Sequence, residues 1–130
     1  MTPEQKIKHL VLLKHFSFSG NEGEPITNEN VDEVYARIED DDGEGWGLQD
    51  ARSEVRGGEA ETNIKTPTSR HYEAKSVAAQ MLDGSWVGWT YWYGGGKHGE
   101  PEGIDWMDEA YDLTCTEEEK TVIVRTFAPT

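Results

Sequence analysis

The sequence is poor in cysteine, in cations and in long apolar runs. Its single cysteine, Cys115, cannot form a disulfide within the chain, which indicates a reducing compartment. No stretch approaches the roughly 20 apolar residues needed to cross a bilayer. The apolar run at residues 10–13 is also too short for the core of a signal peptide. We therefore expect a cytoplasmic protein that does not enter membranes.

Negative charge dominates the composition. The 130 residues include 26 Asp and Glu against 12 Lys and Arg, for a net charge of −14. Residues 22–44 hold ten carboxylates and one cation, Arg37, while residues 100–119 hold nine carboxylates and neither Lys nor Arg. Such a chain is repelled by phosphate backbones and anionic lipid surfaces, which excludes direct nucleic-acid and membrane binding. The acidity indicates either a basic protein partner or a general contribution to solubility.

The first half of the chain has the pattern of three helices. Thr2, Pro3 and Gln5 make a good helix start, and the apolar spacing predicts a helix from residue 3 to about residue 16. A second start at Thr27 or Asn28 precedes an apolar face that extends to residue 38. A third helical stretch covers residues 48–55 and closes at two glycines. Residues 57–70 have the composition of a linker or long loop.

The second half has the pattern of antiparallel strands. Asp83-Gly84 is a strong hairpin signal, followed by an aromatic and β-branched strand at residues 85–93. Residues 72–82 fit a helical stripe as well, and we predict a strand there because the turn needs a partner. Residues 111–115 and 121–127 alternate around an acidic turn and predict a second hairpin. In that strand, Cys115 is expected to face the core.

These elements predict one α+β domain over residues 1–130. The N-terminal helices, at about residues 3–56, are expected to pack on one face of a C-terminal four-stranded antiparallel sheet, at about residues 71–128. A single core is expected for a chain of this length.

The aromatic strand is the first candidate binding site. Four of the five tryptophans lie between residues 83 and 106. Alternation places Trp86 and Trp92 on one face of the strand and Trp89 on the other. One face can cover the helices, and the other is either covered by the loop after Gly94 or open as a recognition surface. Two further candidate binding residues follow in the glycine-rich loop, Lys97 and His98.

An acidic loop between the second and third helices is a candidate calcium site. Asp40, Asp42 and Glu44 occupy the first, third and fifth positions of an EF-hand pattern. Ala51 stands at the twelfth position, where the pattern needs a bidentate glutamate, so calcium binding is only an alternative. The histidines and Cys115 lack the spacing of a zinc site. No acid and base stand at a convincing catalytic spacing, and we expect neither catalysis nor a cofactor.

Residues 84–102, which read GSWVGWTYWYGGGKHGEPE, resemble a segment of small uncharacterised proteins of bacteriophages and prophages. The resemblance covers about residues 70–128. It implies a bacterial or phage cytoplasmic setting and favours a role in host interaction. It carries no activity and no site residue over to this chain.

The leading hypothesis is a non-enzymatic, acidic accessory protein that binds a host or phage protein. The partner can be a basic protein that handles nucleic acid, because regularly spaced carboxylates can replace phosphates in a basic groove. The alternative is a small-ligand or calcium-binding domain. The residues expected to form the acidic surface are Asp40, Asp41, Asp42, Glu44, Glu117, Glu118 and Glu119.

Overall fold

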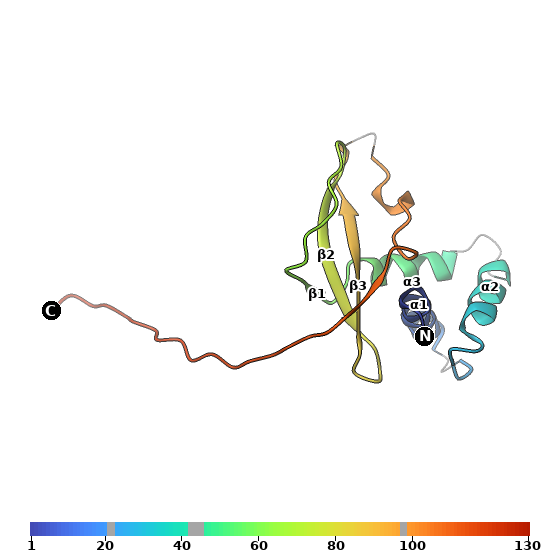
Figure 1. The fold of residues 1–130 in the computed structure, drawn as a ribbon, viewed down its shortest axis with the longest axis horizontal. Coiled ribbons are helices and arrows are strands. Elements are labelled where there is room, and N and C mark those ends of the chain that lie inside the picture. Colours follow the sequence, from blue (N-terminus) through green and yellow to red (C-terminus); the bar gives the residue numbers. More distant parts are fainter. Residues whose placement is uncertain (21–22, 42–45, 97–98) are drawn as a thin grey trace.

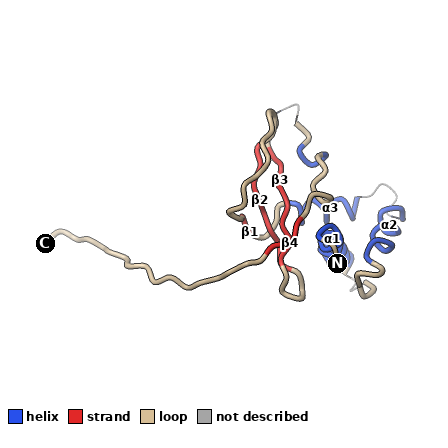
Figure 2. Tube along the Cα trace, viewed as in Figure 1, coloured by secondary structure: helices blue, strands red, loops and turns tan. Residues whose placement is uncertain are grey.

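The fold is a layer of helices on one face of a sheet. The computed structural model describes residues 1–20, 23–41, 46–96 and 99–130. In these ranges three α-helices precede an antiparallel sheet with the strand order β1-β2-β3-β4. Helix α1 lies between the sheet and α2, and it contacts α2, α3, β3 and β4 (Figure 1, Figure 2). The predicted α+β class, with helices on a four-stranded antiparallel sheet, is confirmed.

Helix α1, Pro3–Ser19, begins where the sequence indicates and continues past the predicted end at about residue 16. The Thr2 hydroxyl accepts a hydrogen bond from the Gln5 backbone N–H at 3.2 Å, and the Gln5 side chain accepts one from the Thr2 N–H at 2.8 Å. This capping box satisfies two N–H groups that the first helical turn leaves free. Gly20 ends the helix with a φ of 74°, a conformation that favours glycine.

The other two helices also match the sequence pattern. Helix α2 covers Val31–Asp41 and α3 covers Trp46–Arg56. The predicted start at Thr27 is a capped turn ahead of α2. In this turn the Thr27 hydroxyl accepts hydrogen bonds from the backbone N–H groups of Glu29 and Asn30. A glycine with a φ of 73°, Gly58, then turns the chain toward the sheet.

A hairpin of two long strands forms the centre of the sheet. Strand β2, Glu73–Gln80, pairs with β3, Trp86–Tyr93, along its whole length, so the strand predicted before the turn is confirmed. Met81 donates its N–H to the carbonyl of Ser85 at 2.8 Å, which closes a loop of three residues, one more than a minimal turn. Gly84 has a φ of 89° in this loop, as the bulged three-residue hairpin requires.

The two edges of the sheet differ from the prediction. Strand β4, Tyr111–Leu113, pairs with β3, but the expected return strand at residues 121–127 is not part of the sheet. The other edge is β1, Ala60–Glu61, which pairs with β2 inside the segment predicted as a loop. The turn at Gly58 brings the chain so close to β2 that a Cβ there would stand 2.6 Å from Cβ of Val77. Tertiary contact therefore makes a strand from a sequence without strand propensity.

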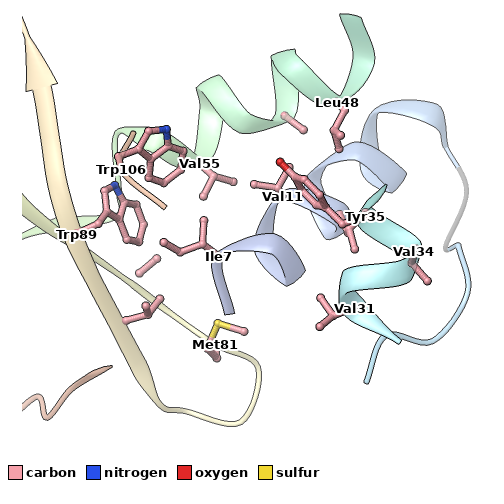
Figure 3. Close-up of a cluster of buried hydrophobic side chains, with 14 of the residues drawn as sticks. Ile7, Val11, Val31, Val34, Tyr35, Leu48, Val55, Met81, Trp89 and Trp106 are labelled. Atoms are coloured by element: carbon pink, nitrogen blue, oxygen red, sulfur yellow. The ribbon is translucent and has the colours of Figure 1, made fainter. Parts of the chain in front are cut away.

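The core lies between α1, α3 and the sheet, and it continues to α2 (Figure 3). Ile7 and Val11 of α1 are fully buried, and so is Trp89 of β3. The remaining buried members of the cluster are Leu12, Val31, Val34, Tyr35, Leu48, Ala51, Val55, Val77, Ala79, Met81, Val87 and Trp106. This packing fixes the helices and the segment after β3 relative to the sheet.

Candidate functional site

Two tryptophans of the aromatic strand are buried, and one is half-buried. Trp89 has 0% exposed surface and donates its indole N–H to the carbonyl of Arg56 at 2.8 Å. Trp92 is also buried, while Trp86 is half-buried beside a groove on the sheet face away from Trp89. Trp89 is therefore a core residue, Trp92 is buried outside the core cluster, and Trp86 keeps partial exposure. The two other predicted binding residues, Lys97 and His98, lie outside the described residues.

The segment after β3 covers the same sheet face as the helices. Its Trp106 ring lies on the Trp89 ring with a centroid distance of 5.5 Å, beside Val55 of α3 (Figure 3). On the opposite face of the sheet, the side chains of Tyr111 and Leu113 from the neighbouring strand β4 lie against Gly88. Trp106 thus anchors this segment next to the helices. The segment carries about half of the carboxylates of residues 100–119.

This anchoring creates an acidic cleft between the helices and the segment after β3. The cleft has a volume of about 460 Å³. Its lining comes from all three helices and from the segment after β3, which are far apart in sequence. The lining residues are Glu4, Lys8, Tyr35, Glu39, Arg52, Glu102, Gly103, Asp105, Trp106, Met107 and Asp108. Three of its carboxylates come from residues 100–119, one comes from residues 22–44, and Glu4 comes from the start of α1.

The charges of the acidic cleft do not balance. Five carboxylates and two cations line it, which leaves three negative charges. Both cations already have acidic partners: Lys8 lies 3.0 Å from Asp32, and Arg52 lies 2.9 Å from Glu39. Along the segment after β3, the remaining carboxylates form no salt bridge with another described residue; these are Glu102, Asp105 and Asp108. Three exposed carboxylates are therefore available to a cation from outside.

The acidic cleft is also lined by aromatic and apolar residues, of which the two aromatic ones are buried. These residues are Tyr35, Trp106 and Met107. The Tyr35 hydroxyl oxygen accepts hydrogen bonds from the Arg52 guanidinium at 2.6 and 2.9 Å. Burial raises the pKa of Tyr35 despite this neighbouring cation, so the phenol stays neutral. The Tyr35 ring already faces two cations of this chain, since Lys8 Nζ lies 5.5 Å and the Arg52 guanidinium carbon 5.7 Å from its centroid.

Other predicted acidic residues lie away from the cleft or outside the described residues. Asp40 is exposed on α2 but does not line the cleft. Asp42 and Glu44 are outside the described residues, as is the side chain of Asp41, so the calcium hypothesis stays a prediction. The three glutamates at 117–119 are exposed on the segment that leaves the sheet after β4 (Figure 1). Among the described residues no group of three or more His, Cys, Asp or Glu side chains is placed to hold a metal ion.

Cys115 is exposed, so the prediction that it faces the core was wrong. The expectation rested on the alternation of Cys115 with polar residues along a strand at residues 111–115. Strand β4 ends at Leu113, and the residues that follow leave the sheet. Without a covering layer, the alternating pattern does not bury the thiol.

In the sequence, the residues that line the cleft were indicated only by the acidic character of their segments. Sequence reasoning noted the block at residues 100–119 but did not select Glu102, Asp105 or Asp108. Their spacing of three, with Trp106 among them, was a local signal of carboxylates displayed around an anchor. The contributions of Glu4 and Glu39 had no such signal, because they depend on how the helices pack.

Comparisons with protein-family models, with curated proteins and with solved structures returned no match. Within the part of the chain that the structure describes, no helix is long and apolar enough to span a membrane.

Proposed function

We propose that this chain is a non-enzymatic accessory protein of phage or prophage origin that acts in the cytoplasm by binding a basic protein partner through its acidic cleft. The observation that carries the proposal is that three exposed carboxylates of the segment after β3 lie on one concave surface with Glu4 and Glu39 of the helices. An acidic surface that served solubility alone would need no concave shape.

The cleft favours a partner segment rich in arginine or lysine. Each of Glu102, Asp105 and Asp108 can accept hydrogen bonds from a guanidinium or ammonium group. Exposed ion pairs of this kind contribute about 0.5 to 1 kcal/mol each. Three of them change affinity by roughly tenfold to a hundredfold. They also speed association with a positively charged partner.

Proteins that handle nucleic acid are a natural class of partner. Their binding grooves display arginine and lysine at the spacing of phosphates, and carboxylates along a rim can occupy the same positions. The net charge of −14 adds long-range attraction to such a groove. Binding by this route weakens as salt rises, because surface charges are screened over about 10 Å at 0.1 M salt.

Two variants with the same change in charge test the proposal. The cleft variant carries Glu102→Gln, Asp105→Asn and Asp108→Asn. The control variant carries Glu29→Gln, Glu33→Gln and Asp50→Asn, three exposed residues that do not line the cleft. Each variant is titrated with an oligo-arginine peptide by calorimetry at low and moderate salt.

The expected result is a loss of about tenfold or more in affinity for the cleft variant and a loss of less than about threefold for the control. Equal losses in the two variants would mean that the peptide responds to net charge alone, and the proposal would fail. Binding that is indifferent to salt would contradict it as well.

A further inference from the structure

Residues 114–130 form an arm that leaves the sheet after β4 and extends away from the rest of the molecule (Figure 1). It holds four large apolar side chains that the described fold leaves open. They are Val122, Ile123, Val124 and Phe127, with exposed fractions of 76%, 81%, 83% and 85%. Soluble proteins rarely present a run of this kind without a partner.

The arm has the sequence of a β-strand without a neighbour. Residues 121–127 are β-branched or aromatic except for Arg125, and residues of this kind are enriched in sheets. The arm also continues the edge strand β4, whose outer side pairs with no other described strand. Unpaired backbone N–H and C=O groups on an edge are a template for another strand. Strand propensity and an open edge therefore lie on one continuous segment.

We propose that the arm pairs antiparallel with the arm of a second copy of this chain, so that the two arms form a two-stranded ribbon that joins the two molecules. Such pairing is self-complementary, because one two-fold axis satisfies both arms and closes the assembly at two copies. The interface uses residues outside the acidic cleft, so this inference stands independently of the proposed function.

Charge complementarity favours a second copy as the occupant. With the two-fold axis at Thr121, Arg125 of each arm stands opposite Glu117 of the other. With the axis at Val122, it stands opposite Glu119. Opposite charges placed directly across two strands stabilise their pairing. The acidic turn thus gives Arg125 a partner in neighbouring registers. With the axis at Val122, the apolar residues Val122 and Ile123 stand opposite Val122 and Thr121 of the other arm.

Sedimentation equilibrium over micromolar concentrations tests the inference. The wild-type chain is expected to form dimers. Ile123→Pro removes a backbone donor at the centre of the arm and is expected to give monomers with an unchanged circular dichroism spectrum of the folded domain. Leu82→Ser is the control, because Leu82 is 82% exposed but lies outside the arm, and this variant should dimerise like the wild type.

A charge exchange tests the pairing itself. Arg125→Glu should raise the dimer dissociation constant about tenfold, since like charges then face each other. Mixing it with a variant that carries Glu117→Lys, Glu118→Lys and Glu119→Lys should restore association between the two different chains.

Three results would overturn the inference. The first is a wild-type chain that stays monomeric over the whole range. The second is a dimer that survives Ile123→Pro. The third is slow hydrogen exchange of the arm amides in a monomer, which would mean that the arm folds back on its own β4.

Discussion

Replacing Trp106 by alanine tests how the acidic cleft is built. The Trp106 ring is 5% exposed and lies on the buried ring of Trp89 at 5.5 Å. Cutting a buried tryptophan to alanine costs about 3 to 5 kcal/mol of unfolding free energy, from lost transfer free energy and the cavity left behind. A domain of this size has about 5 to 15 kcal/mol in total, so the loss is large. We expect a marked fall in the urea midpoint, followed by far-ultraviolet circular dichroism.

Trp86→Ala is the matched control. It makes the same chemical change at a half-buried ring on the opposite face of the sheet, and about half the cost is expected. In the Trp106 variant the segment at residues 101–108 should also exchange its amide hydrogens faster and bind oligo-arginine more weakly. If Trp106→Ala costs no more than Trp86→Ala, the ring pair does not anchor this segment, and the reasoning behind the cleft is refuted.

Two further substitutions test the sheet edge and the pH dependence of stability. Gly88→Val places a Cβ 2.6 Å from Cδ1 of Leu113, so we expect β4 to shift, with a loss of about 1 to 3 kcal/mol in urea unfolding; an unchanged midpoint would contradict this. Burial lowers the pKa of His9 below its usual 6.5, although Asp83 opposes the shift. The His9 imidazole therefore binds a proton more tightly in the unfolded chain than in the folded one. The stability that His9 contributes is full above pH 6.5 and is lost as pH falls through the lowered pKa. His9→Gln should flatten this part of the pH profile of the urea midpoint, and an unaltered profile would assign it to other groups.

The helices and the central hairpin could be predicted because their causes are local. The capping box at Thr2 and the glycine at residue 20 are read within one helical turn. The turn at Gly84 needs only a residue that tolerates positive φ between two apolar runs. Such signals depend little on the rest of the fold.

The edges of the sheet could not be predicted because their causes are not local. Residues 60–61 have no strand pattern and become β1 only because Gly58 turns the chain against β2. Residues 121–127 have a strand pattern and lack a neighbour within the described chain. Strand propensity states what a segment can do, while the available partner decides whether it pairs.

The candidate site was predicted in part. The acidic character of residues 100–119 and the partner class that it favours follow from composition. The cleft itself depends on the ring contact between Trp106 and Trp89 and on the packing of α1 against α2. No spacing in the sequence reports these contacts. Of the tryptophans that sequence reasoning selected for binding, Trp89 belongs to the core cluster, and Trp92 is buried outside it.

The most direct test of the central claim is to map where a basic peptide contacts the protein. Oligo-arginine is titrated into isotopically labelled protein, and amide chemical shifts are followed by NMR. The cleft account predicts the largest changes at residues 102–108, with smaller ones near Glu39 and Arg52, and their loss in the Glu102, Asp105 and Asp108 variant. Changes spread evenly over all acidic residues, or centred elsewhere on the surface, would contradict it.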